Sequence, residues 1–365
     1  MKRNMSDENL TLDQVRQRID ELDSRIHALI DERAACAKEV ARIKGHGEGV
    51  VYYRPEREAQ ILRRVRERST GEMPAVDMVR IFREIMASCL ALEQQLTVAF
   101  LGPEGSFTQE ATFKHFGHAS LLLPQRSLED VFREVEVKNA NYGVVAVENS
   151  TEGSVAHTLD MLSGANLKVC GEVELRIHHN LLSSEDDLDK IKVVYAHQQA
   201  LAQCRGWLSE HLRGVEQLAV SSNAEAAQRA TTEAGAAAIA GAHAAELYQL
   251  NILANNIEDN ISNKTRFLVI GHSFPPASGQ DKTSLFVVTG NQPGALYRVL
   301  QPFSQHGLSM SKIESRPSKK EAWEYVFFID INGHVDDENV AAALQEIKNE
   351  AHLVKVLGSY PKAVI

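Results

Sequence analysis

Cysteine is scarce in this sequence, and it is not arranged for metal binding or cross-linking. The four cysteines are scattered along 365 residues, with no CxxC pair and no cluster with histidine: Cys36, Cys89, Cys170 and Cys204. A structural zinc site or a disulfide framework needs such spacing. We therefore expect no metal ion, and we do not expect a disulfide-stabilised fold.

Long apolar runs and an excess of basic residues are also missing. No apolar run reaches the length of a membrane span, and the polar start MKRNMSDENL has no apolar stretch behind it. We therefore expect a cytoplasmic protein that does not enter the membrane. The net charge of -10 argues against general binding of nucleic acid, which requires a basic face. Any site for an acidic metabolite must concentrate its positive charge locally.

The chain is too long for one ordinary core, so we expect more than one domain. Residues 6–96 are predicted to form an all-α domain with three helices, at 12–44, 55–69 and 75–96. Residues 97–272 alternate short apolar runs with helical stretches, which is typical of an α/β domain with a mostly parallel sheet. Its strands are expected at 98–101, 143–148, 193–196, 237–241 and 266–271.

The C-terminal part follows a linker rich in proline, glycine and serine at 272–282. Residues 283–361 are predicted to form a small α+β domain in the order βαββαβ. The expected elements are strand 283–290, helix 294–305, strands 309–316 and 325–332, helix 336–349 and strand 353–360. This order is widespread and identifies no function by itself.

The first helix carries a heptad seam that a charge interrupts. Its seam positions are Val15, Ile19, Leu22, Ile26, Leu29, Arg33, Cys36, Val40 and Ile43. Glu93 interrupts a similar seam in the third helix, and Glu58 aligns with apolar residues of the second. Charges in apolar seams are costly unless they are paired or bind a ligand. One interpretation is a purely structural Arg33–Glu93 salt bridge.

The spacing of the basic residues suggests a second interpretation. Arg33 and Lys44 share one face of the helix roughly 16 Å apart, so they could bracket a small dianion. Arg16 lies about 25 Å before Arg33 and points to another side. From a partner chain, Arg16 could reach the same ligand, which would require an intertwined dimer. Otherwise Arg16 is an ordinary surface residue.

Small polar residues recur at the predicted strand ends of the middle domain, where open α/β sheets bind ligands. Ser106 is a plausible helix N-cap, and a helix N-terminus attracts carboxylates. The other stretches are 148–150, 221–223 and 263–267. The pair His178-His179 has no further ligand nearby in the sequence, so we interpret it as structural.

Residues 12–96 resemble the all-helical chorismate mutase family. The resemblance rests on VRQRIDELD (15–23), IDERAACAKEVARIK (30–44), RPEREAQIL (54–62) and IFREIMASCLALEQ (81–94). It implies that arginines bind the two substrate carboxylates: Arg16 from the other subunit, Arg33 and Arg57. It also implies that Lys44 and Glu93 contact the ether oxygen, Glu93 when protonated, and that Glu58 binds the ring hydroxyl.

Two positions depart from that family's pattern. Arg54 stands where some members have aspartate, and we expect its contact to be made by backbone. Cys89 stands where some members have a serine that holds a carboxylate. A thiol is a weak donor, so neighbouring Ser88 or water would replace it. The reaction needs no nucleophile or cofactor, only a folded substrate and stabilisation of charge on the ether oxygen.

Residues 97–272 resemble prephenate dehydratase. The matching stretches are GPEGSFT (102–108), VENSTEGSV (147–155), YAHQQALAQC (195–204), SSNAEAA (221–227), AAIAG (237–241) and NKTRFLVIG (263–271). The resemblance implies two α/β lobes around a cleft, as in type II periplasmic binding proteins. Thr265 matches the family's essential threonine, which would donate to the leaving hydroxyl. Ser106, Asn149, Ser150 and Asn223 are candidate carboxylate donors, and Arg266 is a candidate for charge balance or structure.

The C-terminal domain carries two motifs that resemble the amino-acid-binding motifs of ACT domains in phenylalanine-regulated enzymes. The first is Gly294-Ala295-Leu296-Tyr297, and the second contains Glu314, Ser315 and Arg316 before a proline. Gly294 would let the backbone approach the carboxylate of an amino acid. The resemblance implies that phenylalanine is an effector.

Together these features predict a bifunctional enzyme that converts chorismate to prephenate and prephenate to phenylpyruvate, acts as a homodimer or larger homo-oligomer, and needs no cofactor. One alternative fuses the mutase to a tyrosine-branch dehydrogenase. That enzyme needs a dinucleotide fingerprint, and no GxGxxG occurs. A second alternative makes residues 97–272 a catalytically silent solute-binding module, which the fold would permit.

Overall fold

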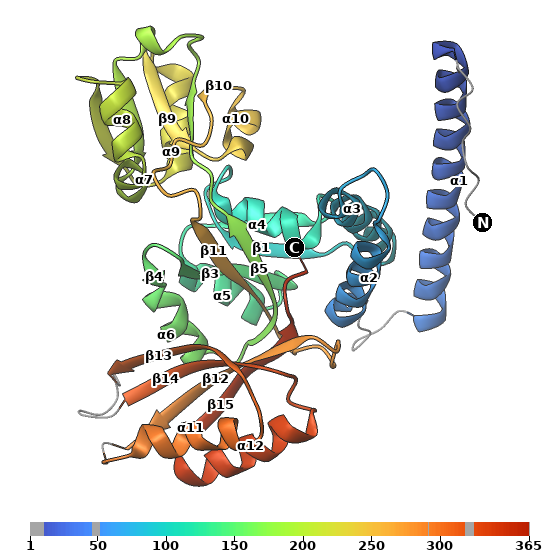
Figure 1. The fold of residues 1–365 in the computed structure, drawn as a ribbon, viewed down its shortest axis with the longest axis vertical. Coiled ribbons are helices and arrows are strands. Elements are labelled where there is room, and N and C mark those ends of the chain that lie inside the picture. Colours follow the sequence, from blue (N-terminus) through green and yellow to red (C-terminus); the bar gives the residue numbers. More distant parts are fainter. Residues whose placement is uncertain (1–10, 46–51, 291, 318–324, 365) are drawn as a thin grey trace.

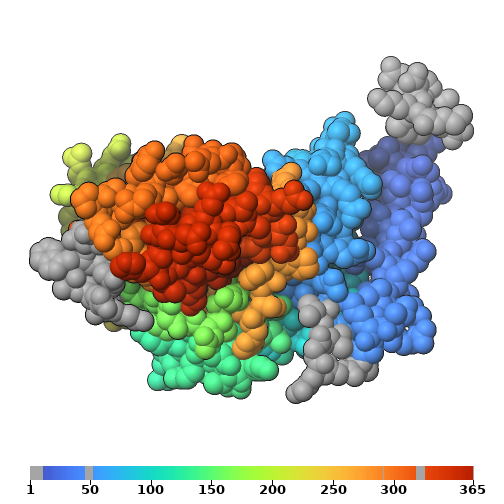
Figure 2. Space-filling model, turned by 90° about the horizontal axis from the view of Figure 1, so that it is seen from below, coloured from blue at the N-terminus to red at the C-terminus, as the bar shows by residue number. Residues whose placement is uncertain are grey.

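The computed structural model describes residues 11–45, 52–290, 292–317 and 325–364. Three parts follow one another along the chain: three helices, a two-lobed α/β domain and a C-terminal α/β sandwich (Figure 1). Seen from below, the C-terminal domain lies directly against the two-lobed domain, and the helices lie at the other end of the molecule (Figure 2). Within the described residues, no helix is both long and apolar enough to cross a membrane.

The helical domain consists of α1 (Leu12–Lys44), α2 (Pro55–Arg68) and α3 (Ala75–Glu93). A capping box between Thr11 and Gln14 begins α1, and Gly45, at a φ of 71°, ends it. The helices α2 and α3 pack through Leu62, Val79 and Met86. In contrast, α1 lies on the outer side of α3 and buries only Ala41 (Figure 1).

The first lobe of the two-lobed domain contains a sheet in the order β5-β11-β3-β1-β2. Its strands are β1 (Thr97–Leu101), β2 (Leu121–Gln125), β3 (Tyr142–Asn149), β5 (Lys168–Arg176) and β11 (Lys264–Gly271). A two-residue strand, β4 (Gly153–Ser154), pairs with β3. The helices are α4 (Phe107–Phe116), α5 (Leu128–Glu136) and α6 (Ala156–Gly164).

The second lobe contains a five-stranded sheet in the order β10-β6-β9-β7-β8. Its strands are β6 (Asn180–Ser183), β7 (Val193–His197), β8 (Glu216–Val220), β9 (Ala236–Ala240) and β10 (Asn251–Ala254). A 3-10 turn at Leu188–Lys190 precedes β7. The helices are α7 (Gln198–Gln203), α8 (Arg205–His211), α9 (Asn223–Thr232) and α10 (Ala242–Tyr248).

The expectation of mostly parallel sheets is wrong, because both sheets are mixed. β1 runs parallel to β2 and β3, but β11 runs antiparallel to β3 and β5. In the second lobe β7 is parallel to β8 and β9, whereas β6 is antiparallel to β9 and β10. The first sheet is mixed because the chain crosses between the lobes twice. β5 leads out of the first lobe, and β11 leads back into it in the opposite direction.

The C-terminal domain has the predicted βαββαβ order. Its elements are β12 (Asp281–Thr289), α11 (Ala295–Gln305), β13 (Met310–Pro317), β14 (Tyr325–Asn332), α12 (Glu338–Glu350) and β15 (Leu353–Pro361). β15 also pairs with β5, where Gly358 lies opposite Val169, so this sheet continues into the first lobe. A Cβ at Gly358 would lie 2.0 Å from the Val169 carbonyl oxygen, so only glycine fits there.

Candidate active sites

A cleft of about 310 Å³ lies between the two lobes. The N-terminal turn of α4 lines it from the first lobe, and the N-terminal turn of α9 lines it from the second. Thr265 and Asn149, at neighbouring ends of β11 and β3, also line the cleft. The cleft therefore combines two helix N-termini, which favour anions, with side-chain donors.

The hydroxyl group of Thr265 is held in one orientation by Asn149. The Asn149 Nδ2 group donates to Thr265 Oγ1 at 2.8 Å and to Asn263 Oδ1 at 3.0 Å. Asn149 Oδ1 accepts the backbone N–H groups of Thr151 and Glu152, at 2.9 and 3.2 Å, which fixes the orientation of the amide. Because Thr265 Oγ1 accepts from Asn149, its own proton remains available for a ligand in the cleft.

The other predicted donors differ in whether they line the cleft and in which hydrogen bonds they already make within the protein. Ser106 is the N-cap of α4, as the sequence predicted, and accepts from the Gln109 N–H. Asn223 accepts the His197 N–H at 2.8 Å through Oδ1, which leaves its NH₂ group for a ligand. Ser150 does not line the cleft. Its Oγ accepts the Lys264 N–H at 2.9 Å and ties the loop after β3 to β11.

Several polar residues of the cleft were not singled out as site residues from the sequence, among them His179, Gln203 and Asn263. His179 Nε2 lies 2.9 Å from Gln203 Oε1, and Asn263 Nδ2 donates to the same oxygen at 3.2 Å. Burial lowers the pKa of His179, so its ring is neutral near pH 7. Gln203 and Asn263 lie in stretches that matched the dehydratase pattern, and this match could have identified them. No matching stretch contains the two adjacent histidines at 178–179.

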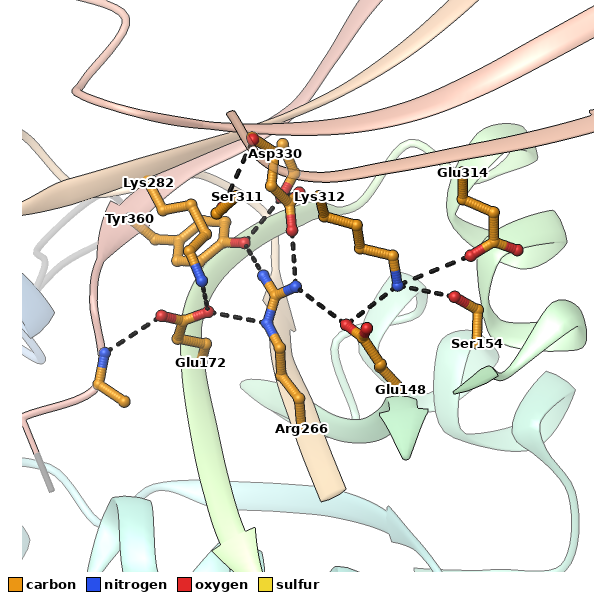
Figure 3. A network of polar contacts seen from close by, with 12 residues as sticks. Glu148, Ser154, Glu172, Arg266, Lys282, Ser311, Lys312, Glu314, Asp330 and Tyr360 are labelled. Atoms are coloured by element: carbon orange, nitrogen blue, oxygen red, sulfur yellow. Dashed lines mark hydrogen bonds and ion pairs between the residues drawn. The ribbon is translucent and has the colours of Figure 1, made fainter. Parts of the chain in front are cut away.

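Arg266 does not line the cleft, and this corrects its selection as a substrate-binding candidate. Strand alternation turns its side chain away from the Thr265 side, toward the C-terminal sheet (Figure 3). There it contacts Glu172 at 2.9 Å, Asp330 at 2.6 Å and the Tyr360 hydroxyl at 2.9 Å. These contacts join the two domains, so Arg266 has the structural role that was one of the two expectations for it.

In the helical domain, Lys44 of α1 and Glu93 of α3 form an ion pair at 3.7 Å. The Glu93 Oε2 atom is buried and accepts no hydrogen bond from any described residue. The expected structural alternative, an Arg33–Glu93 salt bridge, does not form within the described residues. Arg33 is half-buried, and Arg16 lies on the exposed part of α1, near Asp13 at 3.8 Å.

The remaining mutase candidates are not gathered around that ion pair. Glu58 pairs with Arg83 at 3.8 Å, and Arg83 precedes Glu93 by ten residues, about 15 Å of helix. Burial raises the pKa of Glu58 to about 7, and Arg83 offsets only part of this shift. Arg54 pairs with Glu56. Both Arg57 and Ser88 are exposed, whereas Cys89 is buried in α3. Among the described residues of one chain, the mutase candidates therefore do not come together in one place.

The two motifs of the C-terminal domain come to the same end of its sheet. Thr289, at the end of β12, pairs with Tyr325, which pairs with Pro317 at the end of β13. Gly294, at a φ of 76°, begins α11 just beyond that end, followed by Ala295 and Leu296. Glu314, Ser315 and Arg316 lie on β13, the edge strand.

The architecture defines a class: a two-lobed α/β domain with a polar cleft, fused to a helical domain and to a βαββαβ domain. Family models match in the same order: "Chorismate mutase type II" at residues 15–94, "Prephenate dehydratase" at 98–274 and "ACT domain" at 283–349. The bifunctional chorismate mutase/prephenate dehydratase of Stutzerimonas stutzeri is 53% identical over 356 residues, which cover 96% of this chain and 98% of that protein.

Solved structures resemble the two C-terminal parts. Prephenate dehydratase from Arthrobacter aurescens, in complex with L-Phe, is 34% identical with a TM-score of 0.68 and covers 73% of this chain and 90% of its own. A protein described as a novel type of quorum quenching acylase, GqqA, is 30% identical with the same TM-score of 0.68 and covers 73% and 98%. The chain belongs to the bifunctional chorismate mutase/prephenate dehydratase family. It converts chorismate to prephenate and prephenate to phenylpyruvate, so neither the dehydrogenase nor the silent-module alternative is supported.

Proposed function

We propose that Thr265 drives dehydration by donating a hydrogen bond to the hydroxyl group that leaves the prephenate ring. The bond between the ring and its carboxylate breaks and releases carbon dioxide. Its electron pair aromatises the ring and expels hydroxide, which takes a proton from solvent to become water. A threonine hydroxyl is a poor acid, so its contribution is stabilisation of the developing negative charge. The Asn149–Thr265 hydrogen bond of 2.8 Å is the observation that carries this role, because it directs the Thr265 proton away from Asn149.

The substrate's carboxylates are held by the N-termini of α4 and α9 in this proposal. Ser106 and Asn223 lie at these two turns, and they come from opposite lobes. Binding across the cleft would draw the lobes together and exclude water, which strengthens every electrostatic contact inside. Ser150 contributes indirectly, through the loop that carries Asn149.

The test compares T265V with T265S. Loss of one preorganised donor costs about 10²–10³ in kcat, so T265V should lose dehydration by this factor, and T265S should retain most of it. Parent-like thermal unfolding of both variants is the control for folding of the dehydratase domain, and their mutase activity should be unchanged. Unchanged dehydration in T265V would contradict the proposal.

For the mutase, we infer a site shared between two chains. Lys44 and Glu93 act on the ether oxygen, with Arg33 on one carboxylate and Arg16 of a second copy on the other. The supporting observation is the exposed seam of α1: Val15, Ile19, Leu22, Ile26 and Leu29 are 40–63% exposed. A helix of 33 residues that buries one alanine gains little from packing. A second copy would cover the seam and supply Arg16, while exposed Arg57 and Ser88 beside Cys89 remain candidates for the carboxylates.

Phenylalanine is proposed as the effector of the C-terminal domain. The L-Phe complex of the Arthrobacter aurescens dehydratase is the comparison that supports it. In this chain, Gly294-Ala295-Leu296 would face the amino acid's carboxylate, and Glu314, Ser315 and Arg316 would supply polar contacts. Both motifs lie at one end of the sheet, as a shared ligand requires.

A further inference from the structure

A network of charged side chains, most of them largely buried, joins the dehydratase domain to the ACT sheet (Figure 3). Arg266, from the dehydratase side, and Lys312, from β13 of the ACT domain, both approach Glu148 Oε2, at 3.7 and 3.1 Å. The Lys312 side chain is only 11% exposed. A buried ammonium must have all its hydrogen-bond partners supplied by the protein, so the contacts of Lys312 define its role.

Lys312 joins both strands of the short β3–β4 hairpin. Its Nζ atom contacts Glu148 on β3 and Ser154 Oγ on β4, the latter at 2.8 Å. Glu148 and Ser154 are cross-strand partners. The third contact is Glu314 of β13 itself, at 3.7 Å. Both hydrogen bonds of the ammonium thus go to the hairpin, and its longer ion pair goes to the ACT strand.

The same hairpin carries the group that orients Thr265. Asn149 follows Glu148 directly and pairs with Gly153 across the hairpin, beside the pair that Lys312 holds. The loop between the two strands is closed by Asn149 Oδ1, which accepts from Thr151 and Glu152. Movement of Glu148 relative to β4 would therefore shift the Asn149 amide, and with it the direction of the Thr265 hydroxyl.

We propose that Lys312 of the ACT domain is a positioning residue for dehydration, acting through Glu148 and Asn149 on the Thr265 hydroxyl. Lys312 does not line the cleft and touches no substrate. Its effect is to fix the hairpin by bonds from outside the dehydratase domain. The inference rests on the proposed role of Thr265.

Lys355 provides a matched control. It is also a lysine of the ACT sheet that reaches across this domain boundary, but it binds the carbonyl groups of Leu162, Ser163 and Ala165 at 2.7–3.2 Å. These carbonyls belong to the end of α6 and not to the hairpin. K355M therefore weakens the contact between the domains without releasing Glu148 or Ser154.

The experiment measures kcat and KM for prephenate in K312M, K312R, K355M and E148Q. Misplacement of a reacting group by about 1 Å can cost 10²-fold, so K312M should lower kcat about tenfold or more and change KM little. K312R should recover part of this loss, and K355M should keep the parent's kcat. Adding K312M to E148Q should cost less than K312M alone, because both changes break the same contact.

Equal losses of kcat in K312M and K355M would overturn the proposal, since the domain boundary as a whole would then be responsible. Parent-like kcat in K312M would overturn it as well, provided that T265V is inactive in dehydration. If T265V instead keeps its dehydratase activity, the proposed role of Thr265 is wrong, and the proposal for Lys312 falls with it. The thermal unfolding of each variant, compared with the parent's, shows whether its dehydratase and ACT domains have folded.

Discussion

At the scale of single residues, both proposed mechanisms depend on hydrogen-bond donors that the protein holds in place. Thr265 receives one bond from Asn149, which leaves its own proton for the leaving group in our proposal. Glu93, with a buried oxygen next to Lys44, is the residue that we propose for the corresponding role in the mutase. Neither reaction requires a nucleophile, so the orientation of a few donors decides the rate.

Glu93→Gln should preserve the mutase. A carboxyl group donates to the ether oxygen only when it is protonated, whereas an amide donates at every pH. The variant should therefore retain kcat/KM to within about tenfold, and E93L should lose about 10² or more. The measurement is mutase kcat/KM for both variants and the parent at one pH. Equal activity in E93Q and E93L would leave Glu93 with a structural role alone.

Glu58→Gln should change how stability depends on pH. The folded-state pKa of Glu58 is raised from 4.5 to about 7, so between these values the folded protein keeps a proton that the unfolded chain releases. Stability is therefore lost as pH rises through this window, by up to about 3 kcal/mol. In E58Q this loss is absent, and its Tm should fall less than the parent's from pH 5 to 8. Parallel Tm profiles would show that Glu58 does not titrate there.

The sequence could not show which way each functional side chain points. Thr265 and Arg266 are adjacent, and both were candidates, but strand alternation sends one into the cleft and the other to the domain boundary. Which face of β11 is the cleft depends on how the second lobe and the ACT sheet dock. Glu58 was misplaced for a similar reason, because the dehydratase domain, and not the mutase ion pair, covers that part of α2.

At the scale of helices and strands, local chemistry was a good guide. α1 was predicted at 12–44 and is found at Leu12–Lys44, because a capping box and a glycine mark its ends. The βαββαβ order also followed from periodicity. Strand direction in the two lobes could not be predicted from periodicity. β11 pairs with β5 only after the chain has passed through the whole second lobe, so their relative direction depends on the tertiary fold.

The seam of α1 leads to a prediction about assembly. Leu22→Glu places a charge in the proposed contact between two copies and should favour the monomer. The mutase should be lost with the dimer, because Arg16 would no longer reach its site, while dehydratase activity should persist. Sedimentation equilibrium and the two activities measure this outcome. Ser24→Glu is the control, because two residues turn the helix by about 200° and place Ser24 away from the seam. A dimeric L22E with full mutase activity would count against a shared site.

The ACT motifs lead to a second prediction at this scale. Glu314→Ala with Arg316→Ala should abolish phenylalanine binding measured by calorimetry. Arg316 also pairs with Asp160 of α6 at 3.1 Å, so Asp160→Ala is the control that breaks this contact and leaves the motif intact. D160A should still bind phenylalanine. Unchanged binding in the double variant would place the effector elsewhere.

At the scale of the whole molecule, the two activities occupy separate domains, and the ACT domain joins only one of them through a continuous sheet. Gly358 brings β15 against β5, and the Arg266 and Lys312 contacts strengthen the same boundary. The mutase helices share no sheet with the other domains. They contact the dehydratase domain through α2 and α3, and α2 also reaches the linker before β12, where Arg63 donates to the carbonyl groups of Ser278 and Gln280. An effector on the ACT domain thus has its most direct physical connection to the dehydration site.

The central claim is that the protein has two separate active sites that act in sequence: a dehydratase site within one chain, and a mutase site that a second copy of the chain completes. The most direct measurement supplies chorismate to R33A, to T265V and to an equal mixture of the two, and follows prephenate and phenylpyruvate. We predict that R33A leaves chorismate unchanged, that T265V accumulates prephenate, and that the mixture forms phenylpyruvate after a lag. Formation of phenylpyruvate at the parent's rate by either variant alone, or none by the mixture, would contradict the account.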